Sequence, residues 1–179
     1  MPDDVVEVLF TEGQIRTRVQ DLGRQISSDY AGRQLVLISI LRGSVFFATD
    51  LARQIDLSLS MDFLSISSYG ENSEGVVRIT KDLEENIAGK DVLVLEDIID
   101  TGFTLKYLLR TLGGRNPKSL EVCTLLDRRA RRIIEVDLKY VGFEIPDKFV
   151  VGYGLDYAER YRNLPFVGVL KPEVYARGS

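Results

Sequence analysis

Three carboxylates fall within five residues near the middle of the chain, at Glu96, Asp97 and Asp100. They directly follow the strand-like run 91–95. The chain has no histidine, so any acid–base chemistry falls to carboxylates, lysine or tyrosine. Carboxylate oxygens also suit ribose hydroxyls and Mg²⁺, a hard cation that prefers oxygen ligands. The acids therefore predict proton transfer, sugar binding or metal binding at this position.

A candidate phosphate-binding turn follows the acids. Thr101 and Thr104 supply hydroxyl donors, and Gly102 permits the backbone to approach a ligand closely. The start of the next helix adds free N–H groups and a positive dipole end, which favour a phosphate. The simpler alternative is a capped helix start with solvated acids. Two isoleucines lie between the acids and the turn adjoins them, so the pattern favours a ligand site.

The composition is that of an ordinary globular protein, with 45% hydrophobic and 28% charged residues. A length of 179 residues predicts one domain, spanning 1–179. The net charge of −4 argues against a dedicated nucleic-acid binder. The single cysteine, Cys123, excludes a disulfide framework within the monomer and fits a reducing compartment. We expect a cytoplasmic protein with no signal peptide and no membrane-spanning helix, because no apolar run approaches about 18 residues.

Short apolar runs alternate with helical segments, which predicts an α/β fold with an open, mainly parallel sheet flanked by helices. Helices are expected at 11–30, 45–55 and 105–112, with Thr11 and Ser44 as N-caps of the first two. Strands are expected at 35–40, 62–67, 76–80, 91–95, 120–126, 148–152 and 166–170. The returning strand at 76–80 and the short tail strands break the alternation, so we expect a small extra lobe. Ligands bind at the carboxyl ends of strands in such sheets, where the acids are expected to lie.

Segment 92–104 resembles the phosphoribosyl pyrophosphate motif of the type I phosphoribosyltransferases, and more narrowly that of the hypoxanthine-guanine phosphoribosyltransferases. Four further segments fall in that family's order and spacing: 41–43, 67–70, 125–128 and 141–157. The resemblance extends from about Val8 to Tyr175. It implies a single phosphoribosyltransferase domain whose small hood lobe is formed by the N- and C-terminal segments.

The resemblance also implies a reaction in purine salvage. A 5-phosphoribosyl group would move from phosphoribosyl pyrophosphate to N9 of hypoxanthine or guanine, giving IMP or GMP and pyrophosphate. Glu96 and Asp97 would face the ribose hydroxyls, and Asp100 would act as the general base at purine N7. Mg²⁺ is the implied cofactor: Glu96 and Asp97 would help hold a first ion, and Asp156 would reach a second ion through water.

The donor's phosphates are expected at two places. The implied 5′-phosphate site is the loop of Asp100, Thr101, Gly102, Phe103 and Thr104. The implied pyrophosphate contacts are Arg42, Gly43 and Arg162. The family often has lysine at the positions of Phe103 and Arg42. Family structures often have a cis peptide bond at the step that corresponds to Leu41–Arg42, and we expect one here.

The implied purine pocket consists of Arg128, Phe149, Val150 and Asp156. Phe149 would stack on the base, Val150 would offer main-chain hydrogen bonds, and Arg128 would donate to the 6-oxo group, where the family usually has lysine. Apart from the resemblance, Phe149 fits a core aromatic and the run 128–132 fits a solvated basic surface. Ser68 and Tyr69 match a mobile loop that closes over the reaction and excludes water; the alternative is a solvated hairpin tip.

Other classes of function predict different properties. A regulatory member of the same fold would bind RNA or a nucleotide effector, lack the purine segment 149–156 and carry a stronger basic face. An unrelated Mg²⁺-dependent glycosyl or phosphoryl transferase would use the acids 96–100 without needing a purine, and a nucleotide-binding module without turnover would not need Asp100. The favoured function implies phosphoribosyl pyrophosphate and a 6-oxopurine base as partners. It also implies a homodimer or homotetramer, with no membrane and no nucleic acid.

Overall fold

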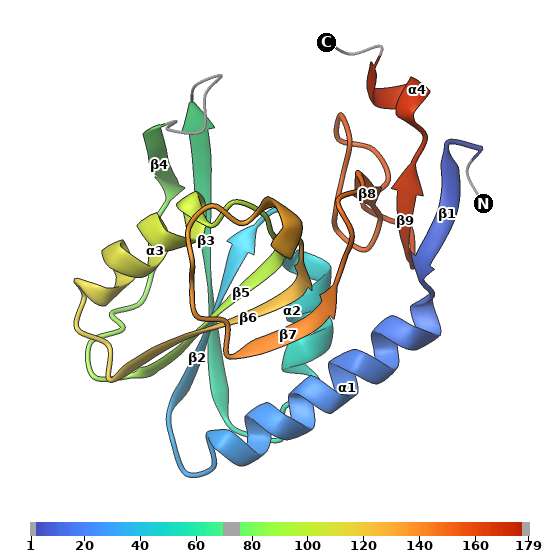
Figure 1. The fold of residues 1–179 in the computed structure, drawn as a ribbon. Helices are drawn as coiled ribbons and strands as arrows, with labels where there is room; N and C mark the ends of the chain where they lie inside the picture. Colours follow the sequence, from blue (N-terminus) through green and yellow to red (C-terminus); the bar gives the residue numbers. More distant parts are fainter. Residues whose placement is uncertain (1–2, 70–75, 177–179) are drawn as a thin grey trace.

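The computed structural model describes residues 3–69 and 76–176. Its main element is a six-stranded sheet in the order β4-β3-β2-β5-β6-β7 (Figure 1). All neighbouring strands in it are parallel except β3 and β4, which form an antiparallel pair. The strands are β2 (Leu35–Leu41), β3 (Leu59–Tyr69), β4 (Val76–Lys81), β5 (Asp91–Ile99), β6 (Ser119–Asp127) and β7 (Tyr140–Glu144).

Helices cover both faces of this sheet (Figure 1). α1 (Glu12–Asp29) and α2 (Val45–Ala52) pack against one face, and α3 (Phe103–Gly113) packs against the other. Strand β2 is buried from Leu35 to Ile40, because both of its faces are covered. No helix in the described ranges is long and apolar enough to cross a membrane.

The two expected N-caps behave differently. Thr11 caps α1 as predicted: its side chain accepts from the N–H of Gln14 in a capping box. Ser44 occupies the N-cap position of α2, as predicted, but its side chain makes no capping hydrogen bond. Its hydroxyl turns back toward the buried end of β2, where it donates to the carbonyl of Ile40 (2.6 Å) and hydrogen-bonds to Ser39 Oγ (2.7 Å).

A second, antiparallel sheet joins the two ends of the chain. Its strands, in the order β1-β9-β8, are β1 (Val5–Phe10), β9 (Val167–Leu170) and β8 (Val150–Val151). Figure 1 shows this sheet at one end of the main sheet, followed by the short helix α4 (Pro172–Tyr175). We call this sheet, with residues 145–166 and α4, the hood. The predicted α/β class with a mainly parallel sheet and a small extra lobe is confirmed. The sequence did not predict β1, β7 or α4 as separate elements.

Candidate active site

The predicted acids lie within the last part of β5. The expectation that this strand ends at Leu95 is wrong, because it continues to Ile99, which pairs with Asp127 of β6. Glu96 and Asp97 are therefore fixed by sheet hydrogen bonding instead of belonging to a loop. They stand at the carboxyl end of a central parallel strand, where open α/β sheets bind their ligands.

A cavity of about 290 Å³ opens at this end of the sheet. Its polar lining contains most of the predicted donor site: Gly43, Glu96, Asp97, Asp100, Thr101, Gly102 and Thr104. Its apolar lining comes from Ile40, Leu41, Ile66, Ile98, Ile99 and Leu105. The structure thus brings the acids, the phosphate turn and the loop after β2 around one space. Phe103 is not part of this lining.

Burial raises the pKa of both strand carboxyls. The pKa of Glu96 lies well above its ordinary value, because of burial and then the charge of Asp97. Burial raises the pKa of Asp97 to about 6, although the N–H of Ile98 donates to its carboxylate (2.8 Å) and opposes the change. Two adjacent carboxylates, Glu96 buried and Asp97 half-buried, fit Mg²⁺, which proteins commonly hold with one or two carboxylates plus substrate phosphates. Within residues 3–69 and 76–176, no larger acidic group gathers into a metal cluster.

The phosphate turn is held in place by a neighbouring segment. Gly102 has a φ of 88°, and a Cβ atom there would lie 2.4 Å from the carbonyl oxygen of Ile134. The N–H groups of Ile133 and Ile134 donate to the carbonyl of Thr101 (3.0 and 2.9 Å). The turn therefore requires glycine at this position. A close approach to a ligand, which the sequence predicts here, would require glycine too. Helix α3 begins directly after it, at Phe103.

The arginine run 128–132 is mostly paired with acids. Three of its arginines form ion pairs: Arg128 with Asp100, Arg131 with Asp147, and Arg132 with Asp127. Arg132 also donates from Nε to the carbonyl of Asp100 (2.9 Å). The sequence did not single out Arg132, because its run looked like a basic surface. The structure instead makes Arg132 a buried support of the turn.

Arg128 and Asp100, predicted as the 6-oxo donor and the general base, are in contact. Nη1 of Arg128 lies 3.3 Å from Oδ1 of Asp100. Arg128 is only 6% exposed, and its Nε has no hydrogen-bond partner among the described residues. Atoms O6 and N7 are neighbours on one edge of a 6-oxopurine. A donor beside a base therefore matches the chemistry of that edge.

The predicted pyrophosphate residues come from two parts of the chain. The peptide bond Leu41–Arg42 is cis, as expected. Nη1 of Arg42 lies 2.8 Å from Oε2 of Glu159. Nη2 of Arg162 lies 2.9 Å from Oδ1 of Asp156 and 3.5 Å from the same Glu159 oxygen. Arg42 and Arg162 are thus joined through Glu159, which the sequence did not predict. Asp156 faces Arg162 and does not stand with the two β5 acids.

The predicted base-stacking residue belongs to an aromatic cluster of the hood. The Phe149 ring stacks on Tyr175 (centroids 5.0 Å apart) and meets Tyr157 edge-on (5.7 Å). Val150 is buried in β8. Neither Phe149 nor Val150 lines the 290 Å³ cavity. Sequence reasoning missed Tyr157 and Tyr175; the recurrence of aromatic residues in this region is the signal that was available.

The predicted closing loop is only partly described. Ser68 and Tyr69 form the end of β3, where they pair with Val77 and Val76 of β4. The rest of that loop, 70–75, lies outside the described residues.

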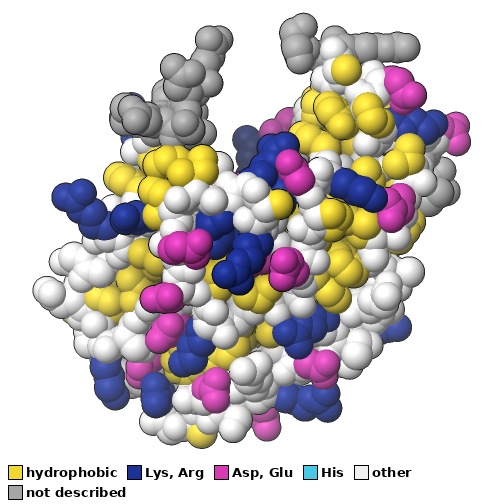
Figure 2. All heavy atoms as spheres, viewed as in Figure 1, with side chains coloured by type: hydrophobic (Ala, Val, Ile, Leu, Met, Phe, Trp, Pro, Cys, Tyr) yellow, Lys and Arg dark blue, Asp and Glu magenta, His cyan; other side chains and the backbone are white. Residues whose placement is uncertain are grey.

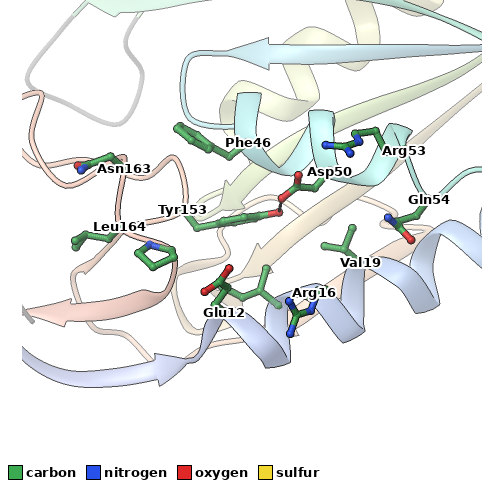
Figure 3. Close-up of a pocket in the computed structure, with 12 residues that line it drawn as sticks. Glu12, Arg16, Val19, Phe46, Asp50, Arg53, Gln54, Tyr153, Asn163 and Leu164 are labelled. Carbon is green, nitrogen blue, oxygen red and sulfur yellow. Dashed lines mark hydrogen bonds between the residues drawn. The ribbon is translucent and has the colours of Figure 1, made fainter.

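A second cavity, of about 430 Å³, lies between α1, α2 and the hood segment 153–165. Although it is larger, it contains none of the predicted site residues. Figure 3 shows Tyr153 crossing it toward α2, where its hydroxyl donates to Asp50 (2.7 Å). We therefore place the chemistry in the smaller cavity, which holds the acids and the phosphate turn.

A parallel sheet that ends in paired acids and a glycine-containing phosphate turn, with a hood beside it, defines a type I phosphoribosyltransferase. The family model for the phosphoribosyl transferase domain matches residues 6–158, and the chain belongs to this family. It is 52% identical to a hypoxanthine-guanine phosphoribosyltransferase of Mycobacterium avium, over 97% of this chain and 90% of that protein.

Solved structures agree with this assignment. A hypoxanthine phosphoribosyltransferase of Staphylococcus aureus has a TM-score of 0.94 and 51% identity, covering 97% of this chain and 95% of that chain. The enzyme of the same name from Trypanosoma cruzi, in complex with the product IMP, has a TM-score of 0.93 and 42% identity, covering 98% and 99%.

Proposed function

We propose that this protein transfers the 5-phosphoribosyl group from phosphoribosyl pyrophosphate to N9 of hypoxanthine or guanine, and so acts in purine salvage. The products are IMP or GMP and pyrophosphate. The observation that carries the proposal is the contact of Arg128 with Asp100 (3.3 Å) beside the acids and phosphate turn of β5. A cation and a carboxylate in contact beside this cavity support the assignment of Arg128 as the donor to the base and Asp100 as the general base. The names of the relatives support the same reaction.

The donor's ribose and 5′-phosphate bind at the end of β5. Glu96 and Asp97 accept from the ribose hydroxyls. The hydroxyls of Thr101 and Thr104 donate hydrogen bonds to the 5′-phosphate, together with backbone N–H groups at the start of α3. Gly102 lets that backbone approach, and Phe103 adds a main-chain donor only, since it carries no charge.

In the reaction the purine loses a proton, and the bond between the ribose anomeric carbon and pyrophosphate breaks. Asp100 receives the proton at purine N7 while N9 bonds to the anomeric carbon. Arg128 donates to the 6-oxo group, Phe149 stacks on the base, and Val150 supplies main-chain contacts. Because Phe149 and Val150 lie in the hood, the purine spans the space between hood and sheet.

The leaving pyrophosphate is held by Arg42, the Gly43 backbone and Arg162. The cation positions fit this role, because they converge from the loop after β2 and from the hood. Mg²⁺ is the proposed cofactor, with Glu96 and Asp97 as the carboxylates for a first ion and Asp156 reaching a second ion through water. When bound, it would supply charge neutralisation for the phosphates. Ser68 and Tyr69 begin the loop that excludes water from the reaction.

We also infer a single domain over 1–179, because β1 and β9, from opposite ends of the chain, pair in one hood sheet. The family implies a homodimer or homotetramer located in the cytoplasm.

An RNA-binding regulatory role is not favoured. The purine segment 149–156 is present. On the face of the molecule drawn in Figure 2, basic and acidic side chains are interspersed. An extended basic stripe would be needed to track a phosphate backbone.

The decisive test is release of pyrophosphate from phosphoribosyl pyrophosphate with and without hypoxanthine. We expect release, and formation of IMP, only when the purine is present. Pyrophosphate release at the same rate without purine would point to a different transferase or hydrolase. Binding without any turnover would point to a nucleotide-binding module.

A further inference from the structure

Glu159 occupies the point where the two pyrophosphate arginines meet. Its Oε2 atom lies 2.8 Å from Nη1 of Arg42 and 3.5 Å from Nη2 of Arg162. Arg42 follows β2 and Arg162 belongs to the hood, so the two cations approach this oxygen from separate parts of the fold. One carboxylate oxygen between two guanidinium groups stands where an anionic phosphate oxygen would bind.

The neighbouring acid has different partners. Asp156 pairs with Arg162 (2.9 Å) and accepts from the N–H of Glu159 (2.9 Å). Arg162 also donates to the carbonyl of Gly154 (2.8 Å), which fixes its direction. The cluster therefore contains two cations and two anions that compensate each other. Asp156 already has a proposed role toward the metal, whereas the carboxylate of Glu159 forms ion pairs with only the two arginines among residues 3–69 and 76–176.

The backbone around Glu159 is unusual. Ala158, Glu159 and Tyr161 have positive φ angles of 51°, 61° and 77°. Residues with a Cβ atom adopt this region rarely and at a cost, and such conformations persist where surrounding contacts enforce them. The hydroxyl of Tyr161 donates to Asp4 (2.7 Å), which anchors the segment to the start of β1. The loop is thus held in a conformation that presents the Glu159 carboxylate to the arginines.

We propose that Glu159 is an internal counter-ion that pyrophosphate displaces from Arg42 and Arg162. The inference rests on the proposed function and adds that Glu159 limits the affinity for the donor and for the released pyrophosphate. The side chains of Arg42 and Glu159 are 71% and 65% exposed, so their ion pair is weak. Its loss should change affinity by about two- to fivefold.

The direct test compares Glu159→Gln with the wild-type protein. The probe is pyrophosphate in the presence of Mg²⁺, titrated by calorimetry, together with the KM for phosphoribosyl pyrophosphate. We expect Kd and KM to fall by about two- to fivefold, and the difference to shrink at high salt. Glu84→Gln is the matched control, because it removes the same charge from an exposed pair with Lys81 (3.1 Å) and should change neither constant.

Two further variants keep the test decisive. Glu159→Asn removes the carboxylate with a residue that tolerates positive φ, so it should bind pyrophosphate at least as tightly as Glu159→Gln. In an Arg42→Gln background most of the gain should disappear, because the stronger contact is gone.

Equal or weaker pyrophosphate binding in both Glu159 variants would overturn the proposal, even if their thermal stability falls. If the wild-type protein nevertheless forms IMP, the proposed function stands without this inference. Absence of IMP formation by the wild-type protein would overturn both.

Discussion

A Cβ atom on Gly43 would lie 1.6 Å from Oδ2 of Asp97, so the backbone after β2 touches the carboxylate at the end of β5. The hood reaches the same point, because a Cβ atom on Gly154 would lie 2.0 Å from the carbonyl oxygen of Gly43. The loop that we propose to bind pyrophosphate, the acid that we propose to bind the ribose, and the hood therefore meet at one glycine. A side chain at this junction would displace the Asp97 carboxylate or the hood backbone.

Gly43→Ala should separate binding from folding. The methyl group would push the Asp97 carboxylate aside, and that carboxylate is the end of a side chain that can rotate. We expect the KM for phosphoribosyl pyrophosphate to rise about tenfold or more, with little change in the thermal midpoint. Gly13→Ala is the control, since a Cβ atom there meets nothing within 4 Å. A wild-type KM in Gly43→Ala would show that Asp97 does not need its present position.

Asp97→Asn should stabilise the ligand-free protein at high pH. Burial raises the pKa of Asp97 from 3.8 to about 6. The folded state therefore binds more protons than the unfolded state between these values, so the free energy of unfolding falls as pH rises through them. Asparagine removes this penalty and should add about 1–3 kcal/mol at pH 8. Urea unfolding at pH 3.5 and pH 8 measures it.

Asp82→Asn is the matched control of opposite sign. Its hydrogen bond with Arg115 lowers the pKa of Asp82, so the charged form contributes stability above the unfolded pKa and loses it as pH falls. This variant should be less stable than wild type at pH 8. A stability difference between Asp97→Asn and wild type that does not change with pH would contradict the assigned cause.

Asp100→Asn tests the general base. Asparagine has nearly the same shape but does not accept a proton, so kcat should fall about 10²–10⁴-fold while donor affinity changes little. Rapid-quench measurement of IMP formation, with separate titration of the donor, distinguishes the two effects. Turnover near the wild-type level would remove Asp100 from this role.

Arg132 should act by positioning Asp100. Lysine keeps the ion pair with Asp127 but lacks the forked second donor that reaches the carbonyl of Asp100. We expect Arg132→Lys to lower kcat about tenfold, without changing the thermal midpoint greatly. Arg132→Met leaves the charge of Asp127 buried without a partner and should cost about 3–5 kcal/mol in stability. If Arg132→Lys loses as much stability as Arg132→Met, and its kcat falls in parallel, Arg132 has a structural role alone.

Local signals predicted much of the fold. The helical spacing and capping box of α1 and the apolar run of β2 depend on neighbouring residues, so the sequence indicates them directly. The acids of β5 and the phosphate turn were found for the same reason. The hydroxyl of Ser44 was misassigned because burial, which the local sequence does not record, turned it toward Ile40.

Contacts across the chain could not be predicted. Glu159 lies in a polar segment that resembles any solvated face, and its ion pair with Arg42 depends on the approach of the hood to the loop after β2. Arg132 belongs to a basic run in the sequence, and only the fold brings it into an ion pair with Asp127. The last residues of β5 depended on pairing with β6, which decided whether Glu96 lies in a strand or in a loop.

Base selectivity should follow hydrogen-bond polarity. Arg128 has only donors, so it satisfies the 6-oxo group of hypoxanthine and guanine but opposes the 6-amino group of adenine. Main-chain carbonyls near Val150 and Asp156 would accept from the 2-amino group of guanine and tolerate the C2–H of hypoxanthine. Xanthine presents an oxygen there, so acceptor would face acceptor. We expect hypoxanthine and guanine to be substrates, xanthine to be weak and adenine to be inactive.

Each mismatched edge leaves buried polar groups unpaired, at about 1–3 kcal/mol per group, which amounts to about 10²-fold or more in kcat/KM. Measuring kcat/KM for all four bases tests this order. Arg128→Lys is the informative companion, because lysine is also a donor but lacks the fork that contacts Asp100. The variant should still reject adenine, while the ratio of hypoxanthine to xanthine reports how far the guanidinium shifts the ring. Adenine turnover comparable to that of hypoxanthine in the wild-type protein would remove Arg128 from the purine pocket.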